Sequence, residues 1–594
     1  MASSHIRPAG GLIDGKWAVW AVAAAFLLML LPRITDVFAG WMPDADDLMR
    51  LQQIRDMIDG QSWFDVDQAR LLTPEGGEMH WSRLPDLFIA GLILVLRPFL
   101  GQTAAESLAI GVWPLILLAA AFTFLTQIMQ RLQLNRAGQA FGLIFFATSA
   151  AVFNFWPGRI DHHGFVVVLT LAGFTAVLSP TLSNRSGIVL ALCVTAMLSI
   201  ALESLPYVGG LIAIMGLFWI VRGHREGVRL GVFGFALIVF ACLFYVLDAP
   251  GGSSARFTCD AYGTSHWAGF LVGGGLFMLL GVFGGVLGTW WTRLIAGAIA
   301  GALTLAVIIA VNPACLADPY ATVSDSVRLS WLNMVGEAKP LSILIAEEPG
   351  RVVWVFGFLA VASLATTMMI VTSSEDQRTA RIGLALLFAL SIVTTIWQIR
   401  GQSFSHVFAA IGAGWMVGML FARWRAKGGA QPLLGLIFAV LILSPITWEN
   451  ISAQFPSRLA PAKNVECITP SAYSSIRKEP LLRIQAPIYL GPQILARTPH
   501  SVFAGPYHRN IQGLERSNEV LIAPADHAHE KLLDLKATHL VFCKGLRETT
   551  RYGEMWPGGL AAHLNRDDIP DWLEPADGLT ETDGVVRLYR IKPE

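Results

Sequence analysis

Thirteen runs of apolar residues, each long enough to approach a bilayer crossing, recur along most of the chain. A membrane helix needs about 20 mostly apolar residues, because nothing inside a bilayer satisfies an exposed backbone. The runs lie at 17–33, 104–129, 139–156, 164–181, 187–202, 206–221, 229–247, 267–288, 291–312, 350–372, 381–398, 403–422 and 432–447. Only 14% of the 594 residues are charged, whereas soluble proteins carry about a quarter. The sequence therefore predicts an all-α polytopic membrane domain over residues 1–447.

Two further segments bear on the number of crossings. The first apolar run, Lys16 to Pro32, lacks a small-residue cleavage site, so we interpret it as a retained membrane helix rather than a signal peptide. The run 84–100 is short and is interrupted by Asp86, Arg97 and two prolines. We expect this segment to lie in the membrane interface as a helix.

The basic residues of the short loops set the predicted orientation, because such residues collect on the cytoplasmic side. With Arg7 and Lys16 in the cytoplasm, nearly every short basic loop also falls inside: those with Arg131 and Arg136, Arg185, Arg222 to Arg229, Arg293, Arg378 with Arg381, and Arg423 to Lys427. Counting 84–100 as a crossing would break this pattern. The long loops 34–103, 157–163, 248–266 and 313–349 are then outside, as is the tail, 448–594.

The tail differs from the rest of the chain in composition. It has many charges and short apolar runs at 487–490, 520–523, 539–542 and 585–591, which resemble strands alternating with helices. We predict a small extracytoplasmic α/β domain over 448–594.

Four of the six cysteines fall in predicted outer segments. Cys193 and Cys242 lie inside helices, where a thiol is ordinary packing. The even number outside suggests two pairs in an oxidising compartment, Cys259–Cys315 and Cys467–Cys543. Free thiols are the alternative.

The first outer loop (34–103) opens with three carboxylates in four residues, Asp44, Asp46 and Asp47. Such groups repel one another unless a cation binds, and oxygen ligands of this kind suit Mg²⁺ or Mn²⁺. A solvated acidic cluster is the ordinary alternative.

The second outer loop (157–163) is only a few residues long and contains Asp161, His162 and His163. Ionisable groups at a membrane boundary are expensive and usually functional, and Asp161 and His163 could turn toward one point. The structural alternative is that Arg159 pairs with Asp161 and that His162 caps the next helix.

Three more ionisable residues fall on the same predicted side of the membrane. Glu337 lies in the 313–349 loop, Glu203 at the outer end of a tight helical hairpin, and Arg400 at the outer end of the eleventh helix. The helix count takes no account of these residues, yet it places all of them on one side of the membrane. This common placement supports a single site.

These motifs resemble those of the GT-C glycosyltransferases, specifically the catalytic subunit of oligosaccharyltransferases. Asp44-Ala-Asp46 resembles the Asp-x-Asp motif of that family's first outer loop. Asp161-His162-His163 is similar to the Asp-His-His motif of its archaeal members, and Met334-Val-Gly-Glu337 to its Ser-Val-Ser-Glu motif. The resemblance covers the membrane region and implies thirteen membrane helices with an extracytoplasmic C-terminal domain.

The resemblance also implies a role for each matching residue. Asp46, Asp161 and His163 would ligate a divalent cation, and Asp44 would ligate it or orient the acceptor. Glu337 would position the acceptor, and Arg400 would neutralise the phosphate of a polyprenyl-linked donor. Inversion at the anomeric carbon is expected from direct displacement.

The tail departs from the family pattern. It lacks the Trp-Trp-Asp-Tyr-Gly motif by which oligosaccharyltransferases recognise Asn-x-Ser/Thr acceptors. Tyr507, His508 and Arg509 could contact substrate in its place or form an ordinary polar turn. Glu203 has no counterpart in the family and could contact the acceptor or pair with a basic residue.

We therefore expect a metal-dependent glycosyltransferase on the periplasmic face of a bacterial inner membrane. The acceptor, whether glycan, lipid or protein, stays open, and nucleic acid is excluded as a partner because the net charge is zero and no basic tract occurs. The alternatives are a secondary transporter, which usually has repeats and midplane charges, and a non-catalytic factor for envelope-polymer assembly.

Overall fold

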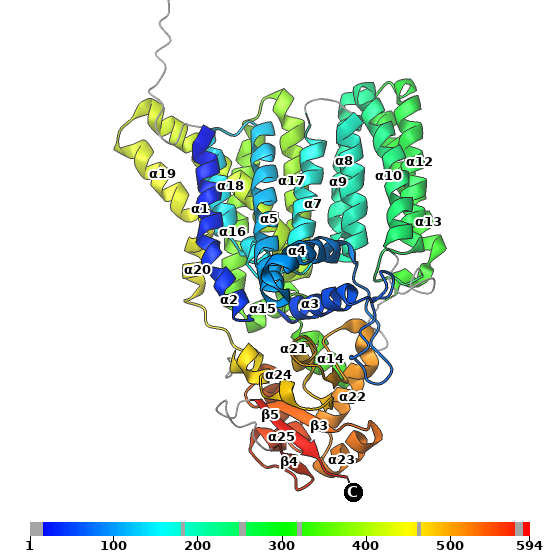
Figure 1. The fold of residues 1–594 in the computed structure, drawn as a ribbon. Coiled ribbons are helices and arrows are strands. Elements are labelled where there is room, and N and C mark those ends of the chain that lie inside the picture. The colour runs from blue at the N-terminus through cyan, green and yellow to red at the C-terminus, as the bar shows by residue number, and fades with distance from the viewer. Residues whose placement is uncertain are drawn as a thin grey trace, which may run out of the picture.

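The computed structural model of the chain describes residues 16–179, 184–248, 257–317, 323–459, 465–576 and 586–593. Arg7, used above to orient the chain, and parts of two outer loops (249–256 and 318–322) lie outside these residues. The described chain forms a bundle of long helices and, beyond one end of that bundle, a smaller α/β region made by the tail (Figure 1).

Each of the thirteen apolar runs contains a helix, as predicted. These helices are α1 (Lys16–Leu30), α5 (Gln102–Arg131), α6 (Arg136–Ala147), α7 (His163–Val177), α8 (Asn184–Ile200), α9 (Leu205–Arg222), α10 (Gly227–Leu247), α12 (Thr264–Phe283), α13 (Trp290–Val311), α16 (Pro349–Val371), α17 (Glu375–Trp397), α18 (Gln402–Lys427) and α19 (Ala430–Ile442). Within the described ranges, nine spans are long and apolar enough to cross a membrane, and a tenth if α19 and the bent α20 (Pro445–Ser452) count together. The chain is a multi-pass membrane protein.

Four of the predicted crossings are shorter than the sequence suggests, one of them being the run 432–447, in which α19 ends at Ile442. Helices α7 and α8 are apolar but have only 15 and 17 residues. The run 139–156 is not one helix, because α6 ends at Ala147 and a 3-10 helix, Ala150–Phe155, follows. The side chain of Ser149 accepts a hydrogen bond from the Ala151 backbone, which competes with continuation of the α-helix.

Two helices of the first outer loop lie across the end of the bundle that faces the tail (Figure 1). They are α3 (Ala45–Ile58) and α4 (Leu84–Leu100). One face of α4 is buried through Ile89 and Ile93, while Val95 and Phe99 stay exposed. This placement agrees with the expectation that 84–100 lies in the interface.

Arginines from four predicted inner loops lie at the same end of the bundle. Each donates to a backbone carbonyl at the end of another helix: Arg131 to Thr175, Arg229 to Val177, Arg293 to Ile220 and Arg381 to Leu132. The tail lies beyond the opposite end (Figure 1). The basic loops and the acidic motifs are therefore separated along the membrane normal.

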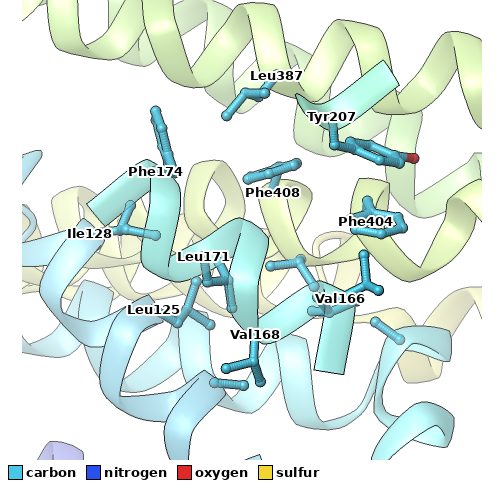
Figure 2. Close-up of a cluster of buried hydrophobic side chains, with 14 of the residues drawn as sticks. Leu125, Ile128, Val166, Val168, Leu171, Phe174, Tyr207, Leu387, Phe404 and Phe408 are labelled. Atoms are coloured by element: carbon cyan, nitrogen blue, oxygen red, sulfur yellow. The ribbon is translucent and has the colours of Figure 1, made fainter. Parts of the chain in front are cut away.

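Helix α7 runs through the centre of the membrane core. Apolar side chains surround it on every side, as expected for a helix with no polar face. Figure 2 shows Val166, Leu171 and Phe174 of α7 packed among residues of α5, α17 and α18. Nearby, the rings of Tyr207 and Phe404 stack with centroids 3.7 Å apart. This rigid packing fixes the position of His163, the first residue of α7.

Glycines allow the closest helix contacts in the bundle. A Cβ atom on Gly414 of α18 would lie 2.5 Å from the Gly138 carbonyl of α6 and 2.8 Å from Gly142. Gly234 and Gly274 bring α10 and α12 together in the same way. Small residues at such contacts are typical of membrane helix packing.

Five short strands form one mixed sheet in the tail, in the order β2-β1-β3-β5-β4. Strands β1, β2 and β3 pair in parallel, and β5 pairs antiparallel with β3 and β4. The strands are β1 (Arg483–Gln485), β2 (Ser501–Val502), β3 (His539–Cys543), β4 (Leu573–Pro575) and β5 (Val586–Ile591). The tail helices are α21 (Gly491–Arg497), α22 (Ile511–Ile522), α23 (Ala525–Asp534), α24 (Arg547–Met555) and α25 (Leu560–Asn565).

Two of the four predicted strands of the tail are wrong. The runs 539–542 and 585–591 correspond to β3 and β5, although Val585 itself lies outside the described residues. The run 487–490 forms a 3-10 helix ahead of Gly491 and Pro492. The run 520–523 includes the last turn of α22, whose buried residues Leu514, Ser517 and Leu521 recur at helical spacing.

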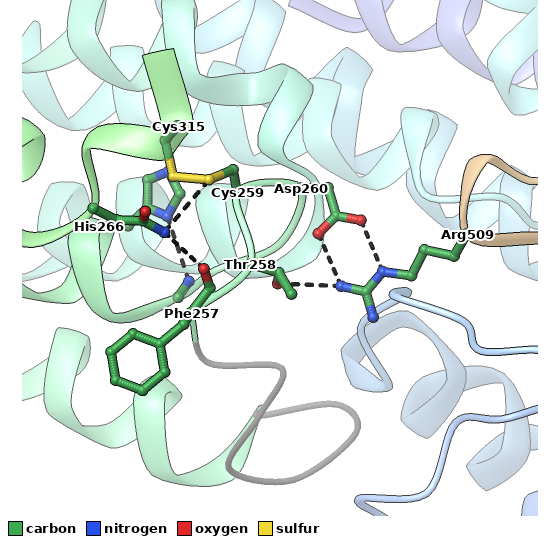
Figure 3. Close-up of a disulfide and its surroundings, with 9 residues drawn as sticks. Phe257, Thr258, Cys259, Asp260, His266, Cys315 and Arg509 are labelled. Carbon is green, nitrogen blue, oxygen red and sulfur yellow. Dashed lines mark hydrogen bonds and ion pairs between the residues drawn. A yellow bond between two sulfur atoms is a disulfide. The ribbon is translucent and has the colours of Figure 1, made fainter. Parts of the chain in front are cut away.

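The tail shares a core with the first outer loop. Leu71 pairs in parallel with Val502, and the Val502 amide donates to the Arg70 carbonyl at 2.9 Å, so the loop extends the sheet beyond β2. Met49 and Trp81 of this loop pack in the same apolar cluster as Ile484 of β1. Disulfides join Cys467 to Cys543 within the tail and Cys259 to Cys315 between two outer loops (Figure 3), the pairings expected from the cysteine count.

Candidate functional site

A cavity of about 570 Å³ lies where the first outer loop, the outer ends of the membrane helices and the tail meet. Most of the predicted site residues line it: Asp44, Asp46, His163, Glu203, Glu337, Arg400, Tyr507 and His508. Asp161 is only 2% exposed and lies directly behind His162 and His163. The structure thus brings residues from six separate segments of the chain to one place.

Asp161, His162 and His163 form a compact group at the start of α7. One oxygen of Asp161, Oδ1, lies 2.7 Å from His162 Nδ1, and the other, Oδ2, lies 3.2 Å from His163 Nε2. Arg159 pairs with Asp44 and Asp47 rather than with Asp161, and the His162 side chain makes no capping bond to α7. Both structural alternatives for this loop are therefore wrong.

Glu203 connects this group to Arg400. Glu203 Oε1 lies 2.7 Å from His163 Nδ1, and Oε2 accepts from Arg400 at 2.7 Å. A carboxylate on Nδ1 fixes the imidazole ring and leaves Nε2 directed to the other side, which is the usual arrangement of a metal-binding histidine. Glu203 thus takes the second role expected of it, pairing with a basic residue, and it also orients His163.

Glu337 and Arg400 are held together by the backbone as well as by their side chains. The Arg400 amide donates to the Glu337 carbonyl at 3.0 Å, and the Ile399 amide donates to the Lys339 carbonyl at 3.0 Å. Glu337 Oε1 lies 3.6 Å from Arg400, and Oε2 lies 3.6 Å from His163 Nε2. The end of the 313–349 loop therefore places a carboxylate beside the histidine.

The acidic turn of the first outer loop begins helix α3. The Asp44 side chain caps the helix by accepting from the Asp46 amide at 3.5 Å, and the positive end of the helix dipole favours Asp46 and Asp47 in the first turn. Arg159 lies between Asp44 and Asp47, at 2.9 and 3.0 Å. One arginine thus partly neutralises this loop and joins it to the second outer loop.

The carboxylates of the site affect one another's ionisation. Removal from water, and then the charges of Asp44, Asp161 and Glu337, raise the pKa of Asp46 well above its ordinary value. Burial also raises the pKa of Asp47, to about 6, against the opposing charge of Arg159. Burial alone would raise the pKa of Asp161 too, but His162 and His163 hold it well below its ordinary value. Asp161 is therefore ionised, while Asp46 ionises at a cost that a bound cation would offset.

The residues present suit a divalent cation. Asp161 Oδ2 is buried and, among the described residues, has no hydrogen-bond partner, although it faces His163 Nε2. Asp161, His162 and His163 offer ligand atoms within 4.8 Å of one another. Asp46 and Glu337 add carboxylates close enough to interact electrostatically with them. Oxygen-rich sites with one imidazole suit Mg²⁺ and Mn²⁺, and also accept Zn²⁺.

The three tail residues flagged in the sequence have different positions. Tyr507 and His508 line the cavity, and the ring of Tyr507 meets Trp81 edge to face. Arg509 does not line it, because its guanidinium holds both oxygens of Asp260 at 2.8 Å and also donates to Thr258 (Figure 3). Arg509 thus fastens the tail to the loop that follows α10.

A second histidine–carboxylate group lies in the same cavity. His80, Asp260 and His508 also offer ligand atoms within 4.8 Å, and His508 Nε2 lies 2.7 Å from Asp260 Oδ2. Arg509 already binds both oxygens of this carboxylate and holds the pKa of Asp260 below its ordinary value despite burial. The Arg509 charge would repel a cation there, so we interpret this group as an ion-paired contact between loop and tail.

Several residues of the site were not assigned from the sequence. Arg50 and Asp86 form a buried ion pair beneath Asp161, and His80 and Asp260 line the cavity. Arg50 follows Asp46 by four residues on one helix, a spacing that could have indicated a shared face. No sequence pattern links Asp260 to Arg509, which lies 249 positions away.

Comparison with known proteins identifies the fold of the chain through solved structures alone. No protein-family profile matches the chain, and no curated protein matches its sequence. Solved structures do match. The archaeal oligosaccharyltransferase AglB from Archaeoglobus fulgidus, in complex with an inhibitory peptide and a dolichol-phosphate, superposes with a TM-score of 0.68 at 12% identity, over 93% of this chain and 72% of that one.

Two other structures of an A. fulgidus oligosaccharyltransferase are similarly close. One is tethered to an acceptor peptide containing the NVT sequon and gives a TM-score of 0.67 at 12% identity, over 97% of this chain and 74% of that one. The other contains zinc and sulfate and gives a TM-score of 0.61 at 12% identity, over 94% and 71%. The chain therefore has the GT-C membrane fold of the archaeal oligosaccharyltransferase.

Proposed function

We propose that this protein is a metal-dependent membrane glycosyltransferase that uses a polyprenyl-linked sugar donor. The observation that supports this best is the convergence of Asp46, Asp161, His163 and Glu337, with Arg400, around one cavity at the end of the membrane bundle. The similar archaeal enzyme was solved with a dolichol-phosphate. A transporter reading is less well supported, because these charged groups gather at one end of the bundle rather than at its middle.

In this proposal, Asp46, Asp161 and His163 would hold a divalent cation, which would supply positive charge to stabilise the phosphate that leaves the sugar. Arg400 would bind the same phosphate, and Glu203 holds both Arg400 and His163 in position. Glu337 and Asp44 bind and orient the nucleophile of the acceptor. The nucleophile displaces the phosphate directly, so the configuration at the anomeric carbon inverts.

The acceptor is an envelope glycan, lipid or protein. Tyr507 and His508 form the tail side of the cavity, where an acceptor would enter beside Glu337. The motif that recognises the sequon is absent from the tail sequence. Asn-x-Ser/Thr peptides are therefore tested on equal terms with glycan and lipid acceptors.

We also propose that the cavity faces the periplasm of a bacterial inner membrane, with the N-terminus in the cytoplasm. Two disulfides on the side of the tail support an oxidising compartment, and the arginines at the other end of the bundle support a cytoplasmic face. Single cysteines introduced into the tail and labelled with a membrane-impermeant thiol reagent test this orientation. We expect them to react in intact cells, and reaction only after lysis would reverse the assignment.

A turnover assay in liposomes tests the activity. Purified full-length protein is given polyprenyl-phosphate and polyprenyl-pyrophosphate sugar donors with glycan, lipid and peptide acceptors, and Mg²⁺ or Mn²⁺ is removed with a chelator and restored. We expect transfer that requires the cation and falls by roughly 100-fold or more in Asp46→Ala and Asp161→Ala. Asp36→Ala, at an exposed position of α2 (Ile34–Phe38), is the matched control.

The outcomes test the assigned metal ligands separately from the glycosyltransferase activity. If both variants keep metal-dependent transfer, the assigned ligands are wrong. If the native protein transfers nothing from any donor, the glycosyltransferase assignment itself loses its support.

A further inference from the structure

Helix α3 carries two buried charged residues that have no role in the scheme above. Asp47 and Arg50 lie one helical turn apart on the same helix, and they are 0% and 1% exposed. Burial of charged side chains is costly unless each finds a partner. Asp47 finds its partners in the second outer loop, more than 100 residues away. Arg50 pairs with Asp86 of the first outer loop and also approaches Asp161 of the second.

Asp47 holds the backbone of the turn that contains Asp161. Its Oδ1 accepts from the amides of Ile160 and Asp161, at 2.8 and 2.9 Å, and its Oδ2 accepts from Arg159 at 3.0 Å. One carboxylate thus satisfies two consecutive amides and an arginine. This set of bonds fixes the direction in which the Asp161 side chain leaves the backbone.

Arg50 interacts with the Asp161 side chain itself. Its guanidinium lies over the ring of Trp81, donates to Asp86 at 2.6 Å and approaches Asp161 Oδ1 at 3.5 Å. The same Oδ1 lies 2.7 Å from His162 Nδ1. Within the described chain, Oδ2 makes no hydrogen bond and lies toward His163 Nε2. The two oxygens of Asp161 are therefore in different environments.

The geometry points to Asp47 and Arg50 as positioning residues of the cation site. Asp47 sets the backbone of the Asp161 turn, and Arg50 together with His162 occupies Oδ1, so that Oδ2 is the oxygen offered to the cation beside His163. This inference rests on the proposed metal site, but it concerns residues that do not touch the cation. Partners of this kind typically change metal affinity by about 10- to 100-fold when they are altered.

Manganese binding measures this role without any turnover. The probe is Mn²⁺ alone, titrated into the full-length protein in detergent, with free and bound ion followed by electron paramagnetic resonance. Asp47→Asn keeps the shape of the side chain but puts an amide where Arg159 needs an acceptor. We expect it to weaken Mn²⁺ binding by about 10-fold or more and to change the spectrum of the ion that still binds.

Asp56→Asn is the matched control. Asp56 lies on the same helix and accepts hydrogen bonds from Gln52 and Gln68, but these partners belong to the first outer loop. A loss that came only from a weakened α3 would appear in both variants. We expect unchanged Mn²⁺ affinity in Asp56→Asn, and we expect any loss of thermal stability to be unrelated to affinity.

A double-mutant cycle with Asp161 completes the test. If Asp47 acts through Asp161, Asp47→Asn has no further effect on Mn²⁺ affinity once Asp161→Asn is present. Additive losses, or equal affinity in native protein and Asp47→Asn, would overturn the inference while leaving the site intact. Failure of the native protein to bind Mn²⁺ would instead count against the proposed metal site.

Discussion

Arg400 donates to Glu203 at 2.7 Å, and the same carboxylate lies 2.7 Å from the ring of His163. One half-buried acid therefore links the arginine proposed for the donor phosphate to the histidine proposed for the cation. A change in the position of Arg400 would therefore affect His163 through Glu203, and the reverse also holds. This coupling makes Glu203 the most informative position outside the ligands themselves.

Glu203→Gln should lower both cation affinity and transfer, by about 10- to 100-fold. The amide keeps the shape of the side chain but weakens its hold on His163 and Arg400. Mn²⁺ titration and the turnover assay measure the two effects. The matched control is Glu226→Gln, a buried acid paired with Arg222 and Arg229 near the opposite end of the bundle. Equal losses in the two variants would mean that general destabilisation explains the result.

The tail should become less stable as pH rises through a window set by Glu548. Burial raises the pKa of this acid from 4.5 to about 7, although the amides of Ile488 and Tyr489 donate to it. The folded state therefore keeps a proton that the unfolded chain releases between about pH 4.5 and 7. Stability falls across that window, by at most roughly 3 kcal/mol, and levels off above it.

Glu548→Gln should remove this part of the pH dependence. Thermal unfolding of the full-length protein between pH 5 and pH 8 gives the comparison with the native chain. Glu519→Gln, at an exposed position paired with Lys531, should leave the pH dependence of the native protein unchanged. An unaltered slope in Glu548→Gln would contradict the assignment.

The contact between Arg509 and Asp260 should contribute more to stability than a similar pair at the surface. Arg509 is 11% exposed and binds Asp260 through two nitrogens, whereas Arg516 is 31% exposed and its partner Glu75 is 49% exposed. We expect Arg509→Ala to cost on the order of 2 kcal/mol and Arg516→Ala less than about 1 kcal/mol. Thermal unfolding ranks the two, and a larger loss in Arg516→Ala would refute the prediction.

Helix packing gives a prediction inside the membrane. Gly414→Ala would place a Cβ 2.5 Å from the Gly138 carbonyl, so α6 and α18 must separate, at a cost of about 1–3 kcal/mol. A Cβ on Gly435 of α19 would meet nothing within 4 Å, so Gly435→Ala should cause no loss. Melting of the detergent-solubilised variants, followed by size-exclusion chromatography, distinguishes them, and equal melting points would disprove the proposed contact.

Much of the membrane fold could be predicted because lipid makes hydropathy decisive. Each apolar run contains a helix. The predicted side of each loop is enough to place Asp46, Asp161, Glu203 and Arg400 at one surface, and the structure brings them to one cavity. The break after Ala147 was missed, since the competing bond from Ser149 depends on local backbone geometry.

The tail and the supporting contacts of the site were harder to predict. Short apolar runs such as 487–490 and 520–523 fit strands and helices equally well, and the packing of neighbouring elements decides between them. The roles of Asp47 and Arg50 depend on bonds to a loop more than 100 residues away. A motif shows which residues carry ionisable groups, but not which of those groups holds another in place.

The pairing of Leu71 with Val502 has a consequence for biosynthesis. The sheet of the tail receives an added edge from a segment made more than 400 residues earlier, so the tail completes this sheet only against the first outer loop. A tail released alone would leave the edge of β2 and the apolar cluster around Ile484 open to other chains. Quality control of this protein would therefore depend on the first outer loop being in place before the tail folds.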